Sequence, residues 1–244
     1  MRLIARLDIK NEYVIKGIQL EGLRKIGEPN EIAFSYYNEG IDEIVFMDAV
    51  ASLYDRNSLF NVIEKACTNI FVPIAVGGGI RSLDDVSKVL NCGADKVIIN
   101  TAAVRDIKIV ENVANRYGSQ CLVGSIEAKF INDKWIAYTD NGRESSGIDV
   151  VEWVDRLEKS GVGEILLTSV DMEGTMRGFD VKLIEEVHGA TNRPVICSGG
   201  YGKPIHLSKL LSLVQPSAIA IASVLHYKKD NIPDLKRGLH GVPK

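Results

Sequence analysis

An internal repeat restricts the fold of this chain more than any other feature of its sequence. The segment GIDEIVFMD begins at Gly40 and matches GVGEILLTS, which begins at Gly161, so the two copies stand 121 residues apart. The same offset relates the glycine pair at 78–79 to the pair at 199–200. Repeated supersecondary units bury a shared core by packing against one another. The sequence therefore predicts two equivalent halves joined in one chain.

Short runs rich in Val, Ile and Leu recur through both halves, and most are continuous apolar stretches, as expected for strands buried on both faces. We identify eight of them: Leu3–Ile9, Ile44–Ala49, Ile74–Gly77, Lys96–Asn100, Leu122–Ala128, Ile165–Val170, Val195–Ser198 and Ala218–Ser223. Segments with helical periodicity lie between them, as at Asp84–Leu90, Val150–Ser160 and Val181–His188. This alternation predicts an α/β fold, a (β/α)8 TIM barrel of two fused half-barrels, with residues 1–244 as a single domain. An open doubly wound sheet is the alternative, but its halves would not give eight strands with matches at both ends.

Two segments interrupt the regular alternation. Lys10–Asn30 is a long stretch after the first strand, and KFINDKWIAYTDNGR follows the fifth strand. The second segment contains Asn-Asp and Asp-Asn-Gly turn signals, which are typical of a hairpin. Because both lie at the C-terminal rim of the predicted barrel, we expect them to form lids over a substrate.

Composition excludes several classes of protein. The chain carries 29 basic and 32 acidic residues, a net charge of −3, and so lacks the positive surplus that nucleic-acid binding needs. No apolar run approaches the length of a membrane span, and no secretory signal pattern precedes the first strand. The four cysteines lie tens of residues apart without a CxxC pair, so we expect no metal site, no disulfide framework and no cofactor. These features together favour a cytoplasmic protein that acts on a small molecule.

Small and hydroxyl residues follow the predicted strands in both halves, where backbone N–H groups and side-chain donors can hold an anion. The first cradle consists of Gly78, Gly79, Asn100 and Thr101. The second cradle consists of Ser198, Gly199, Gly200, Ala222 and Ser223. A single Gly-Gly pair is explained equally well by a tight turn, but two copies related by the repeat favour two phosphate sites. The sequence thus predicts a substrate with a phosphate at each end.

Two acidic residues, Asp8 and Glu127, are also related by the repeat and end the first and fifth strands. Acid–base catalysis needs two groups that hold different protonation states, and a pair of carboxylates at a barrel mouth can supply them. The alternative is that each is a solvated or salt-bridged carboxylate, with Lys10 and Lys129 as the available partners. No histidine offers a competing arrangement, because all four fall in or beyond the predicted outer helices.

The opposite end of the barrel also carries charge. Arg2, Glu43, Lys96 and Glu164 stand at the starts of four strands. The simplest interpretation is a network of ion pairs that closes the barrel floor.

Taken together, these segments resemble the HisF family, the cyclase subunit of imidazole glycerol phosphate synthase, over essentially the whole chain. The matching segments, in the family's order, are LDIK, VIKG, GLRKIGEP, VGGGIRS, GADKVIINTAAV, GSQC, GEILLTS, SGG and ASVLHY. The resemblance implies a lyase-type barrel that accepts ammonia from a glutaminase subunit docked at its floor. The ammonia would react with the bis-phosphorylated substrate PRFAR to give imidazole glycerol phosphate and AICAR.

The resemblance also implies roles for individual residues. Asp8 matches a catalytic aspartate of the family, and Lys16 matches a loop lysine that covers the substrate. Substrate and phosphate positions match Asn100, Thr101, Thr168, Gly174, Ser198, Gly199, Gly200, Ala222 and Ser223. The four floor residues match a charged ammonia gate, and we expect Asp95 beside them to contact the glutaminase.

Three departures from the family pattern predict an altered substrate pocket. Glu127 in SIEAK replaces the second catalytic aspartate, and Glu173 in DMEGT replaces an aspartate of the phosphate loop. Arg6 replaces a small residue two positions before Asp8 and therefore faces the same way. A buried guanidinium is costly unless it is paired, so we expect Arg6 to bind a carboxylate or a phosphate.

These departures leave a second branch of the family open. The segments ARLDIK, QLEGLR, ASLYDRN and TDNGRE resemble paralogues that work with a glutaminase and a sugar amidotransferase to make amidino sugars for surface polysaccharide. A scaffold that only activates a glutaminase is disfavoured, because both cradles and both mouth carboxylates are present. The residues alone do not distinguish the histidine pathway from the polysaccharide role.

Overall fold

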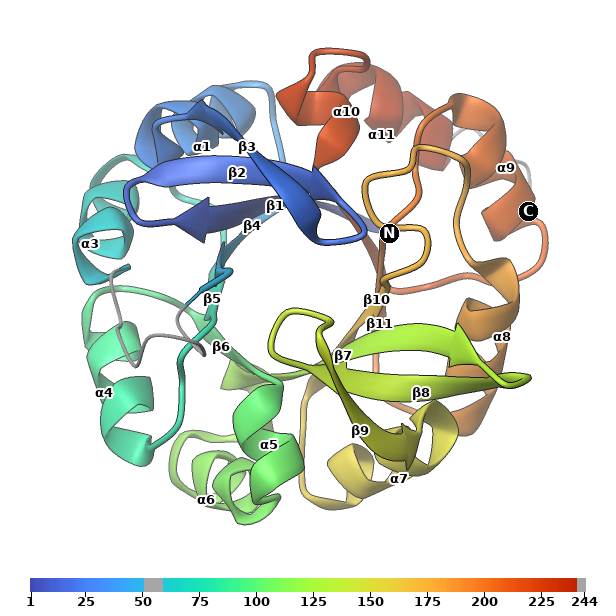
Figure 1. The fold of residues 1–244 in the computed structure, drawn as a ribbon. Helices are drawn as coiled ribbons and strands as arrows, with labels where there is room; N and C mark the ends of the chain where they lie inside the picture. The colour runs from blue at the N-terminus through green and yellow to red at the C-terminus, as the bar shows by residue number, and fades with distance from the viewer. Residues whose placement is uncertain (51–58, 241–244) are drawn as a thin grey trace.

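Eight parallel strands close into a barrel in this computed structural model, which describes residues 1–50 and 59–240 (Figure 1). The barrel strands are β1 (Arg2–Lys10), β4 (Glu43–Asp48), β5 (Ile74–Gly77), β6 (Lys96–Ile99), β7 (Leu122–Ile131), β10 (Glu164–Ser169), β11 (Val195–Ser198) and β12 (Ala218–Ile221). Each strand pairs with the next in this order, β12 returns to β1, and β7 pairs directly with β10. The predicted (β/α)8 barrel is therefore confirmed.

The eight predicted runs coincide with these eight strands, with differences at their ends. β12 ends at Ile221, and Ser223 instead begins the short helix α10 (Ser223–His226). β7 continues three residues beyond the predicted end, because its last residues pair with the following strand of a hairpin.

Helices surround the barrel. They are α1 (Pro29–Asn38), α3 (Phe60–Asn69), α4 (Leu83–Asn91), α5 (Thr101–Arg105), α6 (Lys108–Tyr117), the 3-10 helix η1 (Ser119–Cys121), α7 (Val150–Lys159), α8 (Val181–Ala190), α9 (Pro204–Leu211), α10 and α11 (Ile232–His240). Alternate residues of a strand face opposite sides, so Leu3, Ala5 and Leu7 of β1 join the core beneath the helices. Ile4 faces inward and joins a separate apolar cluster inside the barrel.

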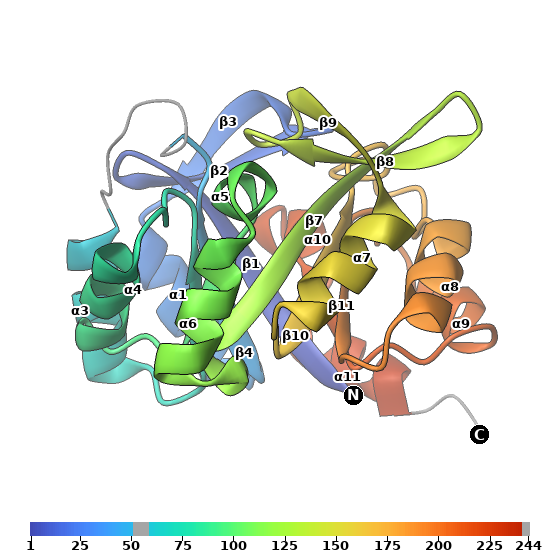
Figure 2. The ribbon, with the colours of Figure 1, turned by 90° about the horizontal axis from the view of Figure 1, so that it is seen from below.

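Two hairpins cover one end of the barrel (Figure 2). The stretch expected as a lid after the first strand is an antiparallel extension of β1, formed by β2 (Tyr13–Ile18) and β3 (Glu21–Gly27). The hairpin predicted after the fifth strand is confirmed as β7, β8 (Lys134–Thr139) and β9 (Glu144–Asp149). The N-terminus lies at the opposite end of the barrel.

No helix within residues 1–50 and 59–240 has the length and apolar character needed to span a membrane.

Candidate active site

A buried network of four charged side chains fills one side of the barrel mouth. Asp8 ends the inward-facing row of β1, and its Oδ1 accepts a hydrogen bond of 2.8 Å from Arg6 Nε. Its Oδ2 lies 3.4 Å from the Nζ of Lys16, which β2 brings over the mouth. Lys16 also forms an ion pair with Glu173 in the loop after β10. Two cations therefore face two carboxylates, and all four side chains are buried.

Arg6 binds groups from three parts of the barrel. Besides Asp8, its Nη1 donates to Thr168 Oγ1 at 2.9 Å and to Ser198 Oγ at 3.4 Å. The expectation that this guanidinium pairs with a carboxylate is thus confirmed. Two predicted substrate residues, Thr168 and Ser198, accept hydrogen bonds from Arg6 in this arrangement.

The network keeps Asp8 ionised. Burial by itself would raise the pKa of Asp8, but the positive charges of Arg6 and Lys16 outweigh burial and lower that pKa to about 2. The carboxylates of Glu173 and Asp8 raise the pKa of Lys16 despite its burial. Asp8 is therefore a carboxylate over the whole physiological pH range.

Glu127 has a different environment on the other half-barrel. It is buried in β7, and its Oε2 accepts a hydrogen bond of 2.7 Å from the backbone N–H of Gly142. Burial raises the pKa of Glu127 to about 7, against the opposing effects of Arg6 and of this hydrogen bond. Near neutral pH, Glu127 can hold a proton while Asp8 cannot.

The lysines considered as partners of these acids do not pair with them. Lys10 is exposed, and the Nζ of Lys129 lies 4.7 Å from the ring centre of Tyr138. Asp8 does form ion pairs, but its partners are Arg6 and Lys16 and not the neighbouring lysine. Lys16 could not be identified as a partner from strand alternation, because its contact depends on how the β2–β3 hairpin folds back.

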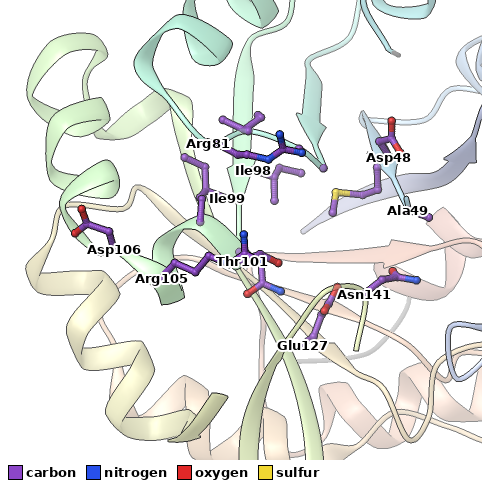
Figure 3. A pocket seen from close by; sticks show the side chains of 16 residues that line it. Asp48, Ala49, Arg81, Ile98, Ile99, Thr101, Arg105, Asp106, Glu127 and Asn141 are labelled. Atoms are coloured by element: carbon purple, nitrogen blue, oxygen red, sulfur yellow. The ribbon is translucent and has the colours of Figure 1, made fainter. Parts of the chain in front are cut away.

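The first cradle borders an open cavity of about 240 Å³ at the mouth (Figure 3). Gly78 lies here with a φ of +90°, and a side chain is excluded because its Cβ would stand 2.3 Å from the carbonyl oxygen of Asp48. The Asn100 amide donates to Tyr138 O at 3.1 Å, and Thr101 Oγ1 accepts from the N–H of Asp140 at 3.1 Å. Both residues therefore also tie the β7–β9 hairpin to the mouth.

Further residues that were not predicted also line this cavity. Figure 3 shows Arg81 on one side and Asn141, beside the predicted Glu127, on the other. Arg105, the last residue of α5, and Asp106, which follows it, also line the cavity. Sequence reasoning missed Arg81 and Asn141 because they lie in loops, where no periodicity indicates which way a side chain points.

The second cradle is much tighter. Its residues surround a space of about 10 Å³, and Glu173, Gly174 and Tyr201 complete the lining. Such a space holds about one water molecule. The structure thus brings the predicted residues of each cradle together, but the cavities beside the two cradles differ in volume.

One histidine, expected in or beyond an outer helix, lies in a helix but is buried near the mouth. His226 belongs to α10, yet it is 9% exposed, and its Nδ1 lies 2.7 Å from the hydroxyl of Tyr36. Burial and the charge of Lys16 lower its pKa to about 4, so it is neutral at physiological pH. It therefore adds no positive charge to the network.

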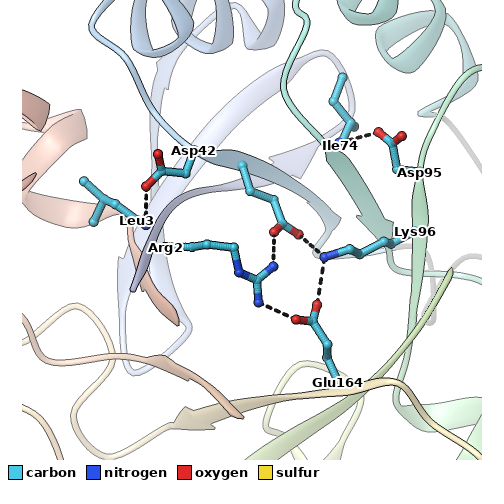
Figure 4. Close-up of polar contacts among 8 residues, drawn as sticks. Arg2, Leu3, Asp42, Ile74, Asp95, Lys96 and Glu164 are labelled. Atoms are coloured by element: carbon cyan, nitrogen blue, oxygen red, sulfur yellow. Dashed lines mark hydrogen bonds and ion pairs between the residues drawn. The ribbon is translucent and has the colours of Figure 1, made fainter. Parts of the chain in front are cut away.

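The floor residues form a closed ring of ion pairs (Figure 4). Arg2 contacts Glu43 at 2.5 Å and also pairs with Glu164. Lys96 bridges the same two glutamates at 3.0 and 2.8 Å. Asp95 stands outside the ring, is exposed, and accepts a hydrogen bond of 2.8 Å from the N–H of Ile74.

Within the described residues, no three His, Cys, Asp or Glu side chains gather as ligands for a metal ion.

Comparison with known proteins identifies relatives over nearly the whole chain. The family model described as histidine biosynthesis protein matches residues 2–231. The imidazole glycerol phosphate synthase subunit HisF of Legionella pneumophila is 56% identical over 204 residues, which cover 83% of this chain and 96% of that relative. The HisF subunit of Pyrococcus furiosus is 45% identical over 244 residues, which cover 99% of this chain and 97% of the relative. The HisF subunit of Bacillus cereus strain Q1 is 44% identical over 242 residues, or 99% and 96% of the two chains.

The names of these relatives agree with the histidine branch, and none of them supports the polysaccharide branch. Of the four segments that suggested the second branch, ASLYDRN lies outside the described residues. ARLDIK, QLEGLR and TDNGRE belong to β1, the β2–β3 hairpin and the loop after β8.

Proposed function

Because this chain belongs to the histidine biosynthesis protein family and its HisF group, we propose that it is the cyclase subunit of an imidazole glycerol phosphate synthase. The reaction would combine ammonia with PRFAR and cleave the resulting adduct, which releases imidazole glycerol phosphate and AICAR. The barrel mouth would hold the substrate, and the floor would face the source of ammonia.

The observation that carries this proposal is the pair of carboxylates with unlike protonation at the mouth. Asp8 is ionised beside Arg6 and Lys16, whereas burial favours a proton on Glu127. Ring closure with cleavage needs one group that removes a proton and one that donates a proton. Asp8 is suited to be the base, and Glu127, which borders the open cavity, is suited to be the acid.

The two ends of the substrate would lie on the two cradles. Glycine backbones and the side chains of Asn100 and Thr101 supply donors at the first cradle. Ser198 and Ser223 supply hydroxyls at the second. Lys16 lies between the second cradle and Asp8, where its charge could meet a phosphate.

Ammonia would enter through the floor from a glutaminase subunit that docks there. The ring of Arg2, Glu43, Lys96 and Glu164 closes this end, and above it the barrel interior is apolar. An apolar interior disfavours protonation of ammonia to ammonium, because it does not solvate the charge. Asp95 is exposed beside the ring and is available to contact the partner.

We test this function by assaying conversion of PRFAR with free ammonium salts. The wild-type chain should form imidazole glycerol phosphate and AICAR. Asp8→Asn should lower kcat by roughly 10²–10⁴-fold, because an amide cannot accept the proton. The measurement is product formation followed by chromatography over a range of substrate concentrations.

Asp133→Asn is the matched control, because it makes the same change in the exposed β7–β8 turn, far along the hairpin. It should leave the rate unchanged. An Asp8→Asn protein that folds and turns over at the wild-type rate would remove Asp8 from the mechanism. A wild-type protein that binds PRFAR without turnover would contradict the proposed reaction.

A further inference from the structure

The two cradles are related by the internal repeat, but they differ sharply in the room that they offer. The first borders a cavity of about 240 Å³, and the second surrounds about 10 Å³. A phosphate group has five heavy atoms and does not fit a space that holds one water molecule. The second cradle is therefore closed to a phosphate in this conformation.

Glu173 is the side chain that closes it. Its carboxylate packs against the cradle, since a Cβ atom on Gly199 would lie only 3.2 Å from Glu173 Oε2. Its backbone is held in place by a hydrogen bond of 3.0 Å from its own N–H to Ser169 O. The side chain is 5% exposed.

The buried partner of this carboxylate is Lys16, the side chain placed over the proposed substrate site. Lys16 pairs with Glu173 on one side and lies 3.4 Å from Asp8 on the other. The carboxylate thus places a negative charge beside the cradle and holds the cation that a phosphate there would attract. A phosphate that enters the second cradle has to displace Glu173 and take over Lys16.

We propose that Glu173 is a specificity-determining residue that excludes free phosphate from the second cradle and admits only a phosphate tethered to one already bound at the first. The inference rests on the proposed function, because it takes both cradles to be phosphate sites of one substrate. Tethering raises the effective concentration of the second phosphate to about millimolar or more, which lets it compete with an internal carboxylate. Ligands with one phosphate gain no such advantage and occupy the first cradle alone.

Equilibrium binding of inorganic phosphate to the full chain tests this proposal, with isothermal titration calorimetry as the measurement. The wild-type protein should bind one phosphate. Glu173→Gln removes the competing charge, and Glu173→Asp keeps the charge but withdraws it by one methylene. Each variant should bind a second phosphate, with an affinity at least about tenfold above any second event in the wild type.

Three further variants assign the sites and control for charge. Asp171→Asn makes the same charge change as Glu173→Gln in the same loop, but its carboxylate accepts from Phe130 N and does not line the cradle. It should bind one phosphate. In the Glu173→Gln background, Ser223→Ala should weaken only the added site, and Thr101→Val should weaken only the original one. Thermal unfolding identifies any variant that fails to fold, and Glu173→Asp, which keeps a carboxylate at this position, carries the test if Glu173→Gln fails.

The outcomes separate this inference from the proposed function. Two phosphates of similar affinity on the wild-type protein would overturn the inference and leave both cradles as phosphate sites. A single phosphate on both Glu173 variants would also overturn it. Failure of every protein to bind phosphate at the first cradle would contradict the phosphate sites of the proposed function and, with them, this inference.

Discussion

At the scale of single residues, the balance of buried charges determines which acid at the mouth is protonated. Arg6 and Lys16 together match the charges of Asp8 and Glu173, so the network is neutral without Glu127. A further buried negative charge would have no full partner, and burial therefore favours the protonated form of Glu127. Arg6 allows Asp8 to be ionised while Glu127 is protonated, because its shortest hydrogen bond is to Asp8.

Glu127 should make the stability of the fold depend on pH. Its pKa rises from 4.5 in the unfolded chain to about 7 in the barrel, so the folded state binds more protons between these values. Stability is then lost as the pH rises from 4.5 to 7. Glu127→Gln keeps an acceptor for the Gly142 N–H but does not titrate. We expect the stability of this variant relative to wild type to increase by on the order of 2 kcal/mol between pH 5 and pH 8, measured by urea unfolding.

Glu144→Gln is the control for this measurement, because Glu144 is exposed in β9. Its difference from wild type should be the same at both pH values. An equal pH dependence in wild type and Glu127→Gln would show that Glu127 is ionised in the folded protein, which would remove it as the acid at neutral pH.

At the scale of elements, the β2–β3 hairpin is held over the mouth by the loop that follows β10. The N–H of Gln19 donates to Glu173 O at 2.7 Å, and its side-chain amide donates to Asp171 O at 3.0 Å. Gly174 in this loop has a φ of +74°, and a Cβ there would stand 2.3 Å from Gly17 O in the hairpin. The two elements therefore approach as closely as backbones can, which places Lys16 in the mouth.

Gly174→Ala should separate the hairpin from this loop. Gly147→Ala is the matched control, because Gly147 has a φ of +72° and no atom within 4 Å of its Cβ position. Both variants carry the strain of a positive φ, about 1–3 kcal/mol, but only Gly174→Ala adds the clash. Amide hydrogen exchange in residues 13–27 should become about tenfold faster in Gly174→Ala alone. Equal exchange in the two variants would show that the hairpin does not depend on this contact.

At the scale of the whole molecule, the barrel has two ends with different electrostatic characters. The mouth carries a neutral network beside an open cavity, and the floor carries a closed ring of two cations and two carboxylates. The inward-facing residues between them are largely apolar. This division suits a molecule that receives a small neutral reactant at one end and transforms a charged substrate at the other.

Lys96→Ala should uncouple the two ends. Without Lys96, Glu43 and Glu164 share only Arg2, and the floor no longer closes as a ring. With a partner glutaminase present, we expect glutamine-dependent turnover to fall by about tenfold, or about 1.4 kcal/mol, with little change in turnover from free ammonium. The ratio of the two rates is the measurement. Lys88→Ala on the surface of α4 is the control, because Lys88 is exposed and pairs with exposed Asp84 of the same helix.

Equal losses from both nitrogen sources, at unchanged stability and partner affinity, would identify the ring as a structural floor alone. In that case coordinated replacement of the ring by apolar residues should be tolerated.

The sequence by itself determined the architecture of this protein. Strand positions follow from local periodicity, and they predicted the eight barrel strands to within a few residues at either end. The equivalence of the two halves follows from the repeat at 121 residues. The same reasoning placed Asp8 and Glu127 toward the mouth, although β1 and β7 continue past them, grouped each cradle and identified the four residues of the floor ring. These features are local, because a residue at the end of a barrel strand faces the mouth whatever surrounds it.

Only the tertiary structure decided which partners those residues contact. Lys16 meets Glu173 across 157 positions of sequence, and Arg6 meets Thr168 across 162. Such contacts depend on barrel closure and on the path of a hairpin, which no local pattern encodes. The unequal room in the two cradles has the same origin. Composition supplied similar glycines and donors to both, but close packing around one glutamate side chain closed the second.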